Sequence, residues 1–203
     1  LLLLPLFASC TDEEIFQGSG VTEGVPTTVD ISVGTAANTA KTRSALLESE
    51  ERKIYNLYLW VFNSSGNVEC SREYSRADLI QAATDLTTST GEVDADAPTS
   101  MGLLKNISLT TGKKTLFLLA NYKSDADGLF HVEPEVLNGI SKYSDLEKVR
   151  AAMTVHTLFR PNGNLLMSLT QTVTVSTATK QIEVSLKRSE AKITLNLQTI
   201  AGL

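Results

Sequence analysis

The sequence predicts a mainly β protein, an antiparallel β-sandwich with one or two short helices. Short apolar segments recur along the whole chain, and turn-forming Asn, Ser, Asp and Gly residues separate them. Some segments alternate apolar with polar residues, as in strands with one buried face, whereas others are apolar throughout, as in fully buried strands. The 203 residues, 42% of them apolar, suffice for one sizeable core.

The first predicted strands lie in the first third of the chain. Residues 27–33 alternate apolar and polar side chains, which predicts a strand with one buried face. Residues 34–43 are small and polar without periodicity and predict a loop. Residues 54–62 are apolar on both faces and predict a central strand. Turn-forming residues at 63–67 then send the chain back through Val68.

The middle of the chain predicts a loop and a hairpin. Residues 84–100 are rich in Thr, Ser and Asp, the composition of a loop. Residues 104–110 and 113–122 have strand composition and flank a turn at Thr111-Gly112. Within the second of these strands, residues 116–120 are all apolar, so we expect burial on both faces.

One helix and several strands are predicted after residue 140. Ser144-Asp145-Leu146-Glu147 has the spacing of a capping box, which predicts a helix that ends near Met153. Four further strands are predicted at residues 165–169, 172–176, 182–186 and 191–197.

The chain opens with the apolar residues 1–9, which are too short to span a bilayer because a spanning helix needs about 20 apolar residues. Pro5 also argues against a core helix. We interpret the segment as a signal peptide remnant. Ala8-Ser9-Cys10 after Leu6-Phe7 resembles the lipobox of bacterial lipoproteins, although Phe7 stands where Leu is usual. The alternative is an ordinary cleaved signal or a chance apolar tail.

Acidic residues follow the cysteine directly. Thr11-Asp12-Glu13-Glu14 resembles the export signal that sends lipoproteins of the Bacteroidota to the outer face of the outer membrane. The alternative is a plain solvated tether. We therefore expect residues 10–26 to be a lipidated acidic tether, held in the outer membrane by acyl chains such as palmitate on Cys10.

Composition and charge exclude several classes of partner. The net charge of −5 leaves no basic stripe for phosphates, so we expect no nucleic-acid partner.

If Cys10 carries lipid, Cys70 has no partner within the chain, because the sequence has only two cysteines. We interpret Cys70 as a small core residue, with a reactive thiol as the alternative.

Residues that typically hold metals or perform catalysis are sparse. His131 and His156 are too few and too far apart for a metal cluster. Asp125-Ala126-Asp127-Gly128 looks like part of a calcium loop, but Lys123 occupies the place of the first carboxylate. No serine has the surroundings of a nucleophile elbow. We expect neither a metal, a cofactor nor an enzyme.

Three strand segments carry a family resemblance. Residues 53–66, 113–121 and 186–193 occur in that order, and together they resemble the N-terminal domain of the Bacteroidales fimbrillin family, the major fimbrial subunits and their accessory relatives. The resemblance spans about residues 25–200. It implies a transthyretin-like β-sandwich for residues 27–203. In the family a second sandwich normally follows, for which this sequence has no room, so we expect a C-terminal part beyond Leu203.

The resemblance also implies a route of assembly. Relatives reach the surface as lipoproteins, and an arginine-specific protease then removes the N-terminal segment with its first strand. A C-terminal strand of the neighbouring subunit fills the emptied groove and builds a filament. Carried over to this chain, the cut follows Arg43 and leaves Ser44 as the new N-terminus, with Arg52 as the second choice. The alternative is that Arg43 is only a solvated loop residue.

The residues themselves make strand exchange physically reasonable. Loss of Val29, Ile31 and Val33 would expose an apolar slot flanked by unpaired backbone groups, which a donated strand would fill. A head-to-tail contact that does not close produces a fibre. We therefore predict a subunit of a cell-surface fimbria whose partners are neighbouring subunits and, at the surface, host ligands.

Two other functions stay open from sequence. An uncleaved accessory protein, such as a fimbrial anchor, a tip or a glycan-binding surface lipoprotein, would keep its acylated Cys10. A surface hydrolase would need a catalytic cluster, which these residues do not contain.

Overall fold

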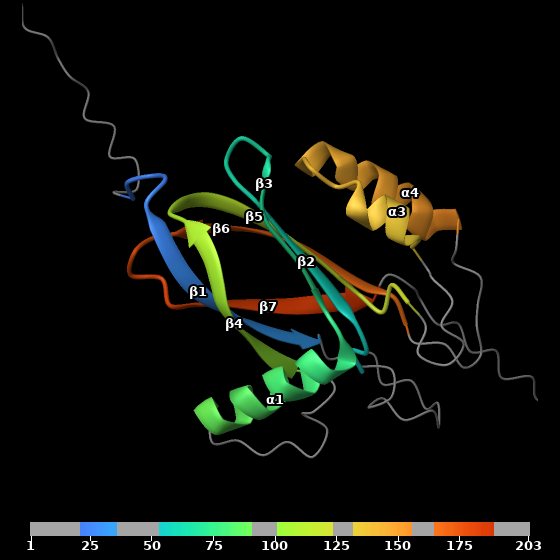
Figure 1. Cartoon of the computed structure of the whole chain (residues 1–203), viewed down its shortest axis with the longest axis horizontal. Helices are drawn as coiled ribbons and strands as arrows, with labels where there is room; N and C mark the ends of the chain where they lie inside the picture. The colour runs from blue at the N-terminus through green and yellow to red at the C-terminus, as the bar shows by residue number, and fades with distance from the viewer. Residues whose placement is uncertain (1–20, 36–52, 91–100, 124–131, 156–164, 189–203) are drawn as a thin grey trace, which may run out of the picture.

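The computed structural model describes residues 21–35, 53–90, 101–123, 132–155 and 165–188, which form a mainly β domain (Figure 1). Its strands are β1 (Pro26–Thr35), β2 (Leu57–Phe62), β3 (Val68–Tyr74), β4 (Met101–Thr110), β5 (Gly112–Ala120), β6 (Met167–Val175) and β7 (Gln181–Arg188). Its helices are α1 (Arg76–Thr90), α3 (Pro134–Asn138), the short 3-10 helix η2 (Tyr143–Asp145) and α4 (Leu146–Val155). The predicted fold class is confirmed.

The strands follow one continuous order, β3-β2-β5-β6-β7-β1-β4, that folds over at one corner. At this corner β6 and β7 share only the pairs Met167–Arg188 and Ser168–Lys187. The corner separates a four-stranded layer, β3-β2-β5-β6, from a three-stranded layer, β7-β1-β4. Neighbouring strands run antiparallel except β1 and β7, which are parallel. Alternation along a strand indicates its buried face but not its neighbour, so the sequence did not predict this parallel pair.

The main core lies between the two layers. Its side chains from the three-stranded layer include Val29, Ile31, Val33, Leu104, Ile107, Ile182, Val184 and Leu186. Those from the four-stranded layer include Leu57, Leu59, Val61, Leu116, Leu118, Met167 and Val175. Inward-facing side chains from both layers thus form the core of a sandwich, as the alternating segments predicted.

A second core covers the outer face of the four-stranded layer. Trp60 and Phe62 of β2 pack there with Phe117 and Leu119 of β5. The helices α3 and α4 supply the covering residues Leu137, Leu146 and Val149. Both faces of β2 and β5 are therefore buried, which confirms the prediction made from their uninterrupted apolar sequence.

Helix α1 corrects the sequence prediction, because residues 84–90 are helical and not loop. Ser75 begins the helix: its N–H donates to the Asp78 carboxylate at 2.8 Å, and its hydroxyl accepts from the Asp78 N–H. This is a capping box with Asp in place of Glu. Leu79 and Ala82 pack into the main core, and Ala82 lies against Gly102 of β4. Few apolar residues of α1 reach the core. The helical periodicity in the sequence is therefore weak, and the Thr and Ser residues led to the prediction of a loop.

Two further predictions are corrected near the C-terminal end. The strands predicted at residues 165–169 and 172–176 are one strand, β6, because Thr and Gln at its centre continue the alternation instead of breaking it. The helix predicted from residue 144 is confirmed as η2 and α4, but its cap differs. The Asp145 carboxylate accepts from the N–H groups of Ser141 and Lys142, at 3.0 and 2.9 Å, whereas Glu147 pairs with Arg150. The strand predicted at 191–197 lies outside the described residues.

Candidate functional site

The candidate site is the groove between β4 and β7, which β1 fills (Figure 1). β1 pairs antiparallel with β4 along Pro26–Gly34 and parallel with β7 along Asp30–Thr35. The strand predicted at 27–33 is confirmed, and Val29, Ile31 and Val33 are at most 2% exposed. Burying side chains of this size stabilises a fold by about 1.5–3 kcal/mol each. β1 is thus an integral strand of the sandwich, and its displacement stays a prediction.

A β-bulge fixes the register of β1 against β4. Val29 pairs with Ile107 and Ile31 with Leu104, so two β4 residues lie opposite the single residue Asp30. One of these two, Asn106, has a positive φ of 58°, the left-handed conformation found in one common type of bulge. The Asp30 carboxylate accepts the Asn106 N–H at 3.0 Å, and the Asp30 N–H donates to the Lys180 carbonyl at 2.9 Å. Asp30 therefore contacts both walls of the groove at one position.

The residues before β1 clasp the turn between β4 and β5. The Thr111 carbonyl accepts from the Gly24 N–H at 3.1 Å, and the Thr111 N–H donates to the Val25 carbonyl at 2.8 Å. The Thr111 hydroxyl accepts from the Val25 N–H at 3.0 Å and donates to the Thr22 carbonyl. Thr111 is only 2% exposed, so its polar groups are satisfied by residues 22–25.

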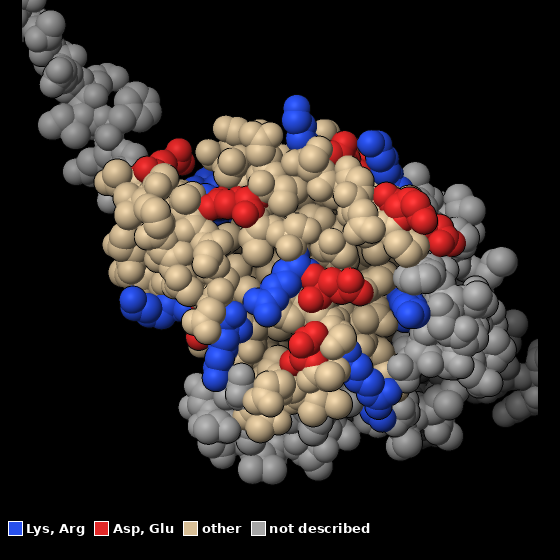
Figure 2. All heavy atoms as spheres, viewed as in Figure 1, with Lys and Arg blue, Asp and Glu red and all other residues tan. Residues whose placement is uncertain are grey.

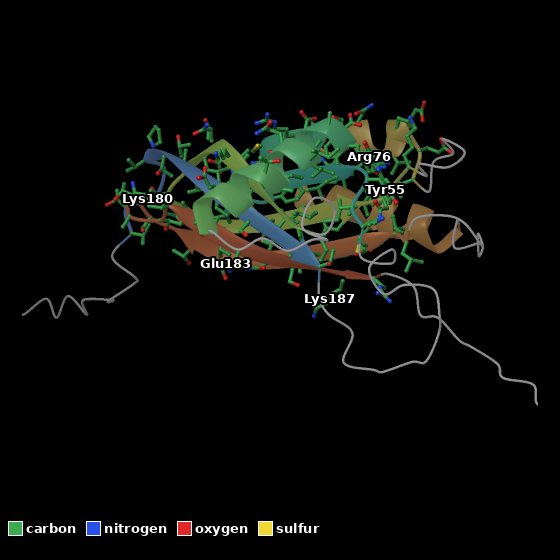
Figure 3. The ribbon with its side chains drawn as sticks, turned by 90° about the horizontal axis from the view of Figure 1, so that it is seen from below. Tyr55, Arg76, Lys180, Glu183 and Lys187 are labelled. Atoms are coloured by element: carbon green, nitrogen blue, oxygen red, sulfur yellow. The ribbon has the colours of Figure 1, made fainter. Side chains whose placement is uncertain are left out.

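The chain that leads into β2 is fixed independently of β1. Asn121, fully buried at the end of β5 with a φ of 59°, accepts the Tyr55 N–H at 2.8 Å. Its amide nitrogen donates to the carbonyls of Lys53 and Leu165, at 2.9 and 2.8 Å. The Arg76 guanidinium adds a contact on the Tyr55 ring, 4.7 Å from its centre (Figure 3). Sequence reasoning missed Asn121, because its partners are far away along the chain.

Contacts other than β1 also hold β4, which is the last strand of the three-stranded layer and has β1 as its only ladder partner among the described strands. The Thr110 N–H donates to the Glu69 carboxylate on β3, and the same carboxylate receives the buried Lys114 ammonium of β5 at 2.5 Å. Burial opposes ionisation of Glu69, but these hydrogen bonds outweigh it and hold its pKa below the ordinary 4.5. Helix α1 packs on the opposite end of β4 at Gly102.

The remaining predicted site residues lie outside the described part of the chain. These are Cys10, Arg43 and Ser44, together with Arg52, His131, His156 and residues 125–128. Cys70 is half-buried against the main core, and burial raises the pKa of its thiol, as expected of a core residue.

The described surface offers no second candidate site. Within the described ranges, no group of three or more His, Cys, Asp or Glu side chains could hold a metal ion. No described helix combines the length and the apolar character needed to cross a membrane. On the face in Figure 2, described acidic and basic side chains are interspersed, without a large patch of one sign.

A family model described as the major fimbrial subunit protein (FimA) matches residues 27–197. The chain belongs to this family. The match covers most of the chain and confirms the resemblance seen in the strand segments. No curated protein sequence matches the chain.

The chain is also similar to parts of solved structures of fimbrial proteins. A fimbrial assembly protein from Parabacteroides distasonis is 14% identical, with a TM-score of 0.44, over 80% of this chain and 52% of that one. The tip fimbrial protein Mfa3 from Porphyromonas gingivalis is 17% identical, with a TM-score of 0.43, over 79% of this chain and 48% of that one. The chain thus spans about half the length of these two proteins. The family match, and not these structures, decides the assignment.

Proposed function

We propose that this chain is a structural subunit of a cell-surface fimbria that polymerises by donor-strand exchange after its first strand has been removed. In this scheme the chain is exported as a lipoprotein acylated on Cys10 and reaches the outer face of the outer membrane. Proteolysis after Arg43 then frees the segment that contains β1. The neighbouring subunit supplies a strand that takes the place of β1.

The observation that carries this proposal is the position of β1. The strand has a ladder partner on each side and buries three aliphatic side chains. Its departure would leave β4 and β7 with unpaired backbone groups and the core without part of one wall. Such a groove selects a strand, because only a strand restores both the ladder and the burial.

The walls of the groove have attachments that do not involve β1, which supports exchange over collapse. β4 is held by α1, by Glu69 and through its short turn to β5. β7 follows β6 through a short turn, in which the Thr179 N–H donates to the Ser176 carbonyl, and keeps Ile182 and Val184 in the core. Asn121 holds Lys53 and Tyr55, the first part of the remaining chain that the structure describes.

Strand donation between identical subunits is head-to-tail. Because the donating and accepting surfaces differ, each added subunit presents a new groove, and the assembly grows as a fibre unless the rotation closes it. A role as a structural subunit agrees with the family to which the chain belongs. Host-surface ligands, if the fimbria binds them, are partners of the assembled filament.

Limited digestion of the purified full-length precursor with an Arg-specific protease tests the proposal. The expected result is a new N-terminus at Ser44, read by N-terminal sequencing, with oligomers that appear by size-exclusion chromatography only after cleavage. Arg43→Ala should abolish the cut and the oligomers, whereas the matched control Arg52→Ala should leave both intact. An uncut precursor, or a cut product that stays monomeric, would contradict the proposal. Mature protein that retains an acylated Cys10, found by mass spectrometry, would indicate an anchored accessory subunit instead.

A further inference from the structure

We propose that the β1 groove selects its occupant by hydrogen bonding as well as by apolar side chains, at the bulge residue Asn106 and at the turn residue Thr111. The strand that a neighbouring subunit donates must then carry a side-chain acceptor, Asp or Asn, opposite Asn106. It must also extend beyond the ladder to reach Thr111. This inference rests on the proposed function and specifies the partner that the groove accepts.

The bulge supplies the first requirement. Asn106 has a left-handed backbone, so its N–H leaves the β4 ladder and is satisfied by the Asp30 side chain instead of a backbone carbonyl. An occupant with an apolar side chain at this position would leave that N–H without its partner. Asn106 is exposed and Asp30 is half-buried, so water competes for this hydrogen bond, but a bond to a charged acceptor contributes more than one to a neutral acceptor.

The same contact sets the register of the occupant. Side chains of a strand alternate between its faces, so a slip by one residue would turn Val29, Ile31 and Val33 out of the core. Asp30 faces outward between Val29 and Ile31, at the point where pairing with β7 begins. An acceptor at the Asp30 position therefore distinguishes this register from a slip by two residues, which would keep the apolar side chains on the core face but move the acceptor away from Asn106.

The clasp at Thr111 supplies the second requirement. All four hydrogen bonds of this buried threonine go to the Thr22–Val25 segment, so they disappear when that segment leaves. Glu23 also packs against Gly112, where a Cβ would lie 3.0 Å from the Glu23 side chain, so the missing side chain of the glycine allows the close approach. An occupant that ends at the position of Pro26 would leave the polar groups of Thr111 without these partners.

A peptide-exchange measurement tests these requirements on the whole chain. The purified chain is cut with an Arg-specific protease, separated from the released segment and titrated into a dilute solution of a fluorescent peptide that has the sequence of residues 22–35. Fluorescence anisotropy then gives the affinity of this peptide and its variants. Asp30→Ala should bind about tenfold more weakly, whereas Asp30→Asn, which keeps an acceptor, should stay within about threefold of the parent. Ser32→Ala, on the same outward face, is the matched control and should bind unchanged.

A shortened peptide isolates the clasp. The peptide of residues 26–35 lacks every partner of Thr111 and should bind at least about tenfold more weakly than the longer one. Thr111→Val in the cut chain should lower its affinity for the longer peptide and leave its affinity for the shorter one unchanged.

If the parent peptide binds but Asp30→Ala and the shortened peptide bind equally well, the groove selects only by burial and this inference is wrong, while strand exchange stands. If the parent peptide does not bind at all, the proposed function fails and the inference with it.

Discussion

β1 and β2 are both central strands of the same sandwich, yet they are buried in different ways. β1 buries one face, and its outward residues Asp30, Ser32 and Gly34 are only half-buried. β2 buries both faces, because Leu57 and Leu59 enter the main core while Trp60 and Phe62 enter the second core beneath α3 and α4. Under the proposed function, the four-stranded layer is the part of the domain that stays in place, and the three-stranded layer contains the strand that we propose is replaced.

An exchangeable strand must be able to leave without exposing more than one core. A strand buried on one face can leave without opening a second core, and its ladder bonds can be rebuilt by any strand of matching register. A strand buried on both faces cannot leave without exposing two cores at once. The comparison predicts that changes in β2 damage the domain before and after strand exchange, whereas changes in β1 matter only before it.

The largest expected effect is that of Trp60→Ala. Trp60 is fully buried, stacks on Tyr58 with ring centres 3.9 Å apart and contacts Phe117, so its loss should leave a large cavity in the second core. We expect the free energy of unfolding to fall by about 3–5 kcal/mol in both the precursor and the cut, polymerised protein. Urea denaturation followed by circular dichroism measures it. Ile80→Ala, at a 45% exposed helix position, is the control and should change little.

Ile31→Ala should destabilise the precursor but not the filament, unlike Trp60→Ala. Ile31 is fully buried in the main core, so the precursor should lose about 2–5 kcal/mol of its free energy of unfolding. After cleavage and assembly the substituted strand is gone, and the filament should melt at the same temperature as the wild type. Calorimetry of the two states side by side separates the effects. A filament as destabilised as its precursor would mean that β1 has stayed in the groove.

Asn121→Ala should have a smaller effect that is again shared by both states. The substitution removes the side-chain partners of Tyr55, Lys53 and Leu165 and places Ala at a left-handed φ of 59°. We expect a loss of about 2–4 kcal/mol in urea denaturation. Asn67→Ala, at an exposed position in the turn before β3, is the matched control. An unchanged denaturation midpoint for Asn121→Ala would show that the start of β2 needs no such anchor.

The sequence predicted the strands that have a clear pattern. Alternation located the buried face of β1, and uninterrupted apolar runs located β2 and β5, because burial on one or two faces leaves a direct trace in the order of residues. The capping box of α1 at Ser75 and Asp78 was present in the sequence as well. The Thr and Ser residues after position 84 concealed it, since their composition is typical of loops.

The candidate site was predictable only in part. The sequence indicated which side chains β1 buries, but not that β7 lies parallel beside it or that Asn106 forms a bulge opposite Asp30. These features depend on residues far apart along the chain, which local patterns do not encode. The clasp at Thr111 could not be predicted for the same reason, because its partners at residues 22–25 lie far away along the chain.

The smallest expected effect concerns pH and the attachment of β4. The pKa of Glu69 is lower in the folded protein than its ordinary 4.5, so ionised Glu69 adds stability at neutral pH. That contribution should disappear as the pH falls from about 4.5 through the lower folded value. Glu69→Gln should flatten this part of the stability profile measured by urea denaturation between pH 3 and 6. Glu183→Gln, at an exposed position on β7 (Figure 3), is the control for the removal of one carboxylate.

The attachment of β4 through Glu69 should matter more in the cut protein than in the precursor. Once β1 has left, β4 would lose its ladder partner and keep its core side chains Leu104 and Ile107, α1, the turn to β5 and the contact of Thr110 with Glu69. The empty groove should therefore depend on Glu69 more than the precursor does. Glu69→Gln should therefore clearly lower the yield of filaments near neutral pH, although it lowers the free energy of unfolding of the uncut chain only slightly. Equal filament yields from both proteins would show that α1 and the turn alone hold β4 ready for the incoming strand.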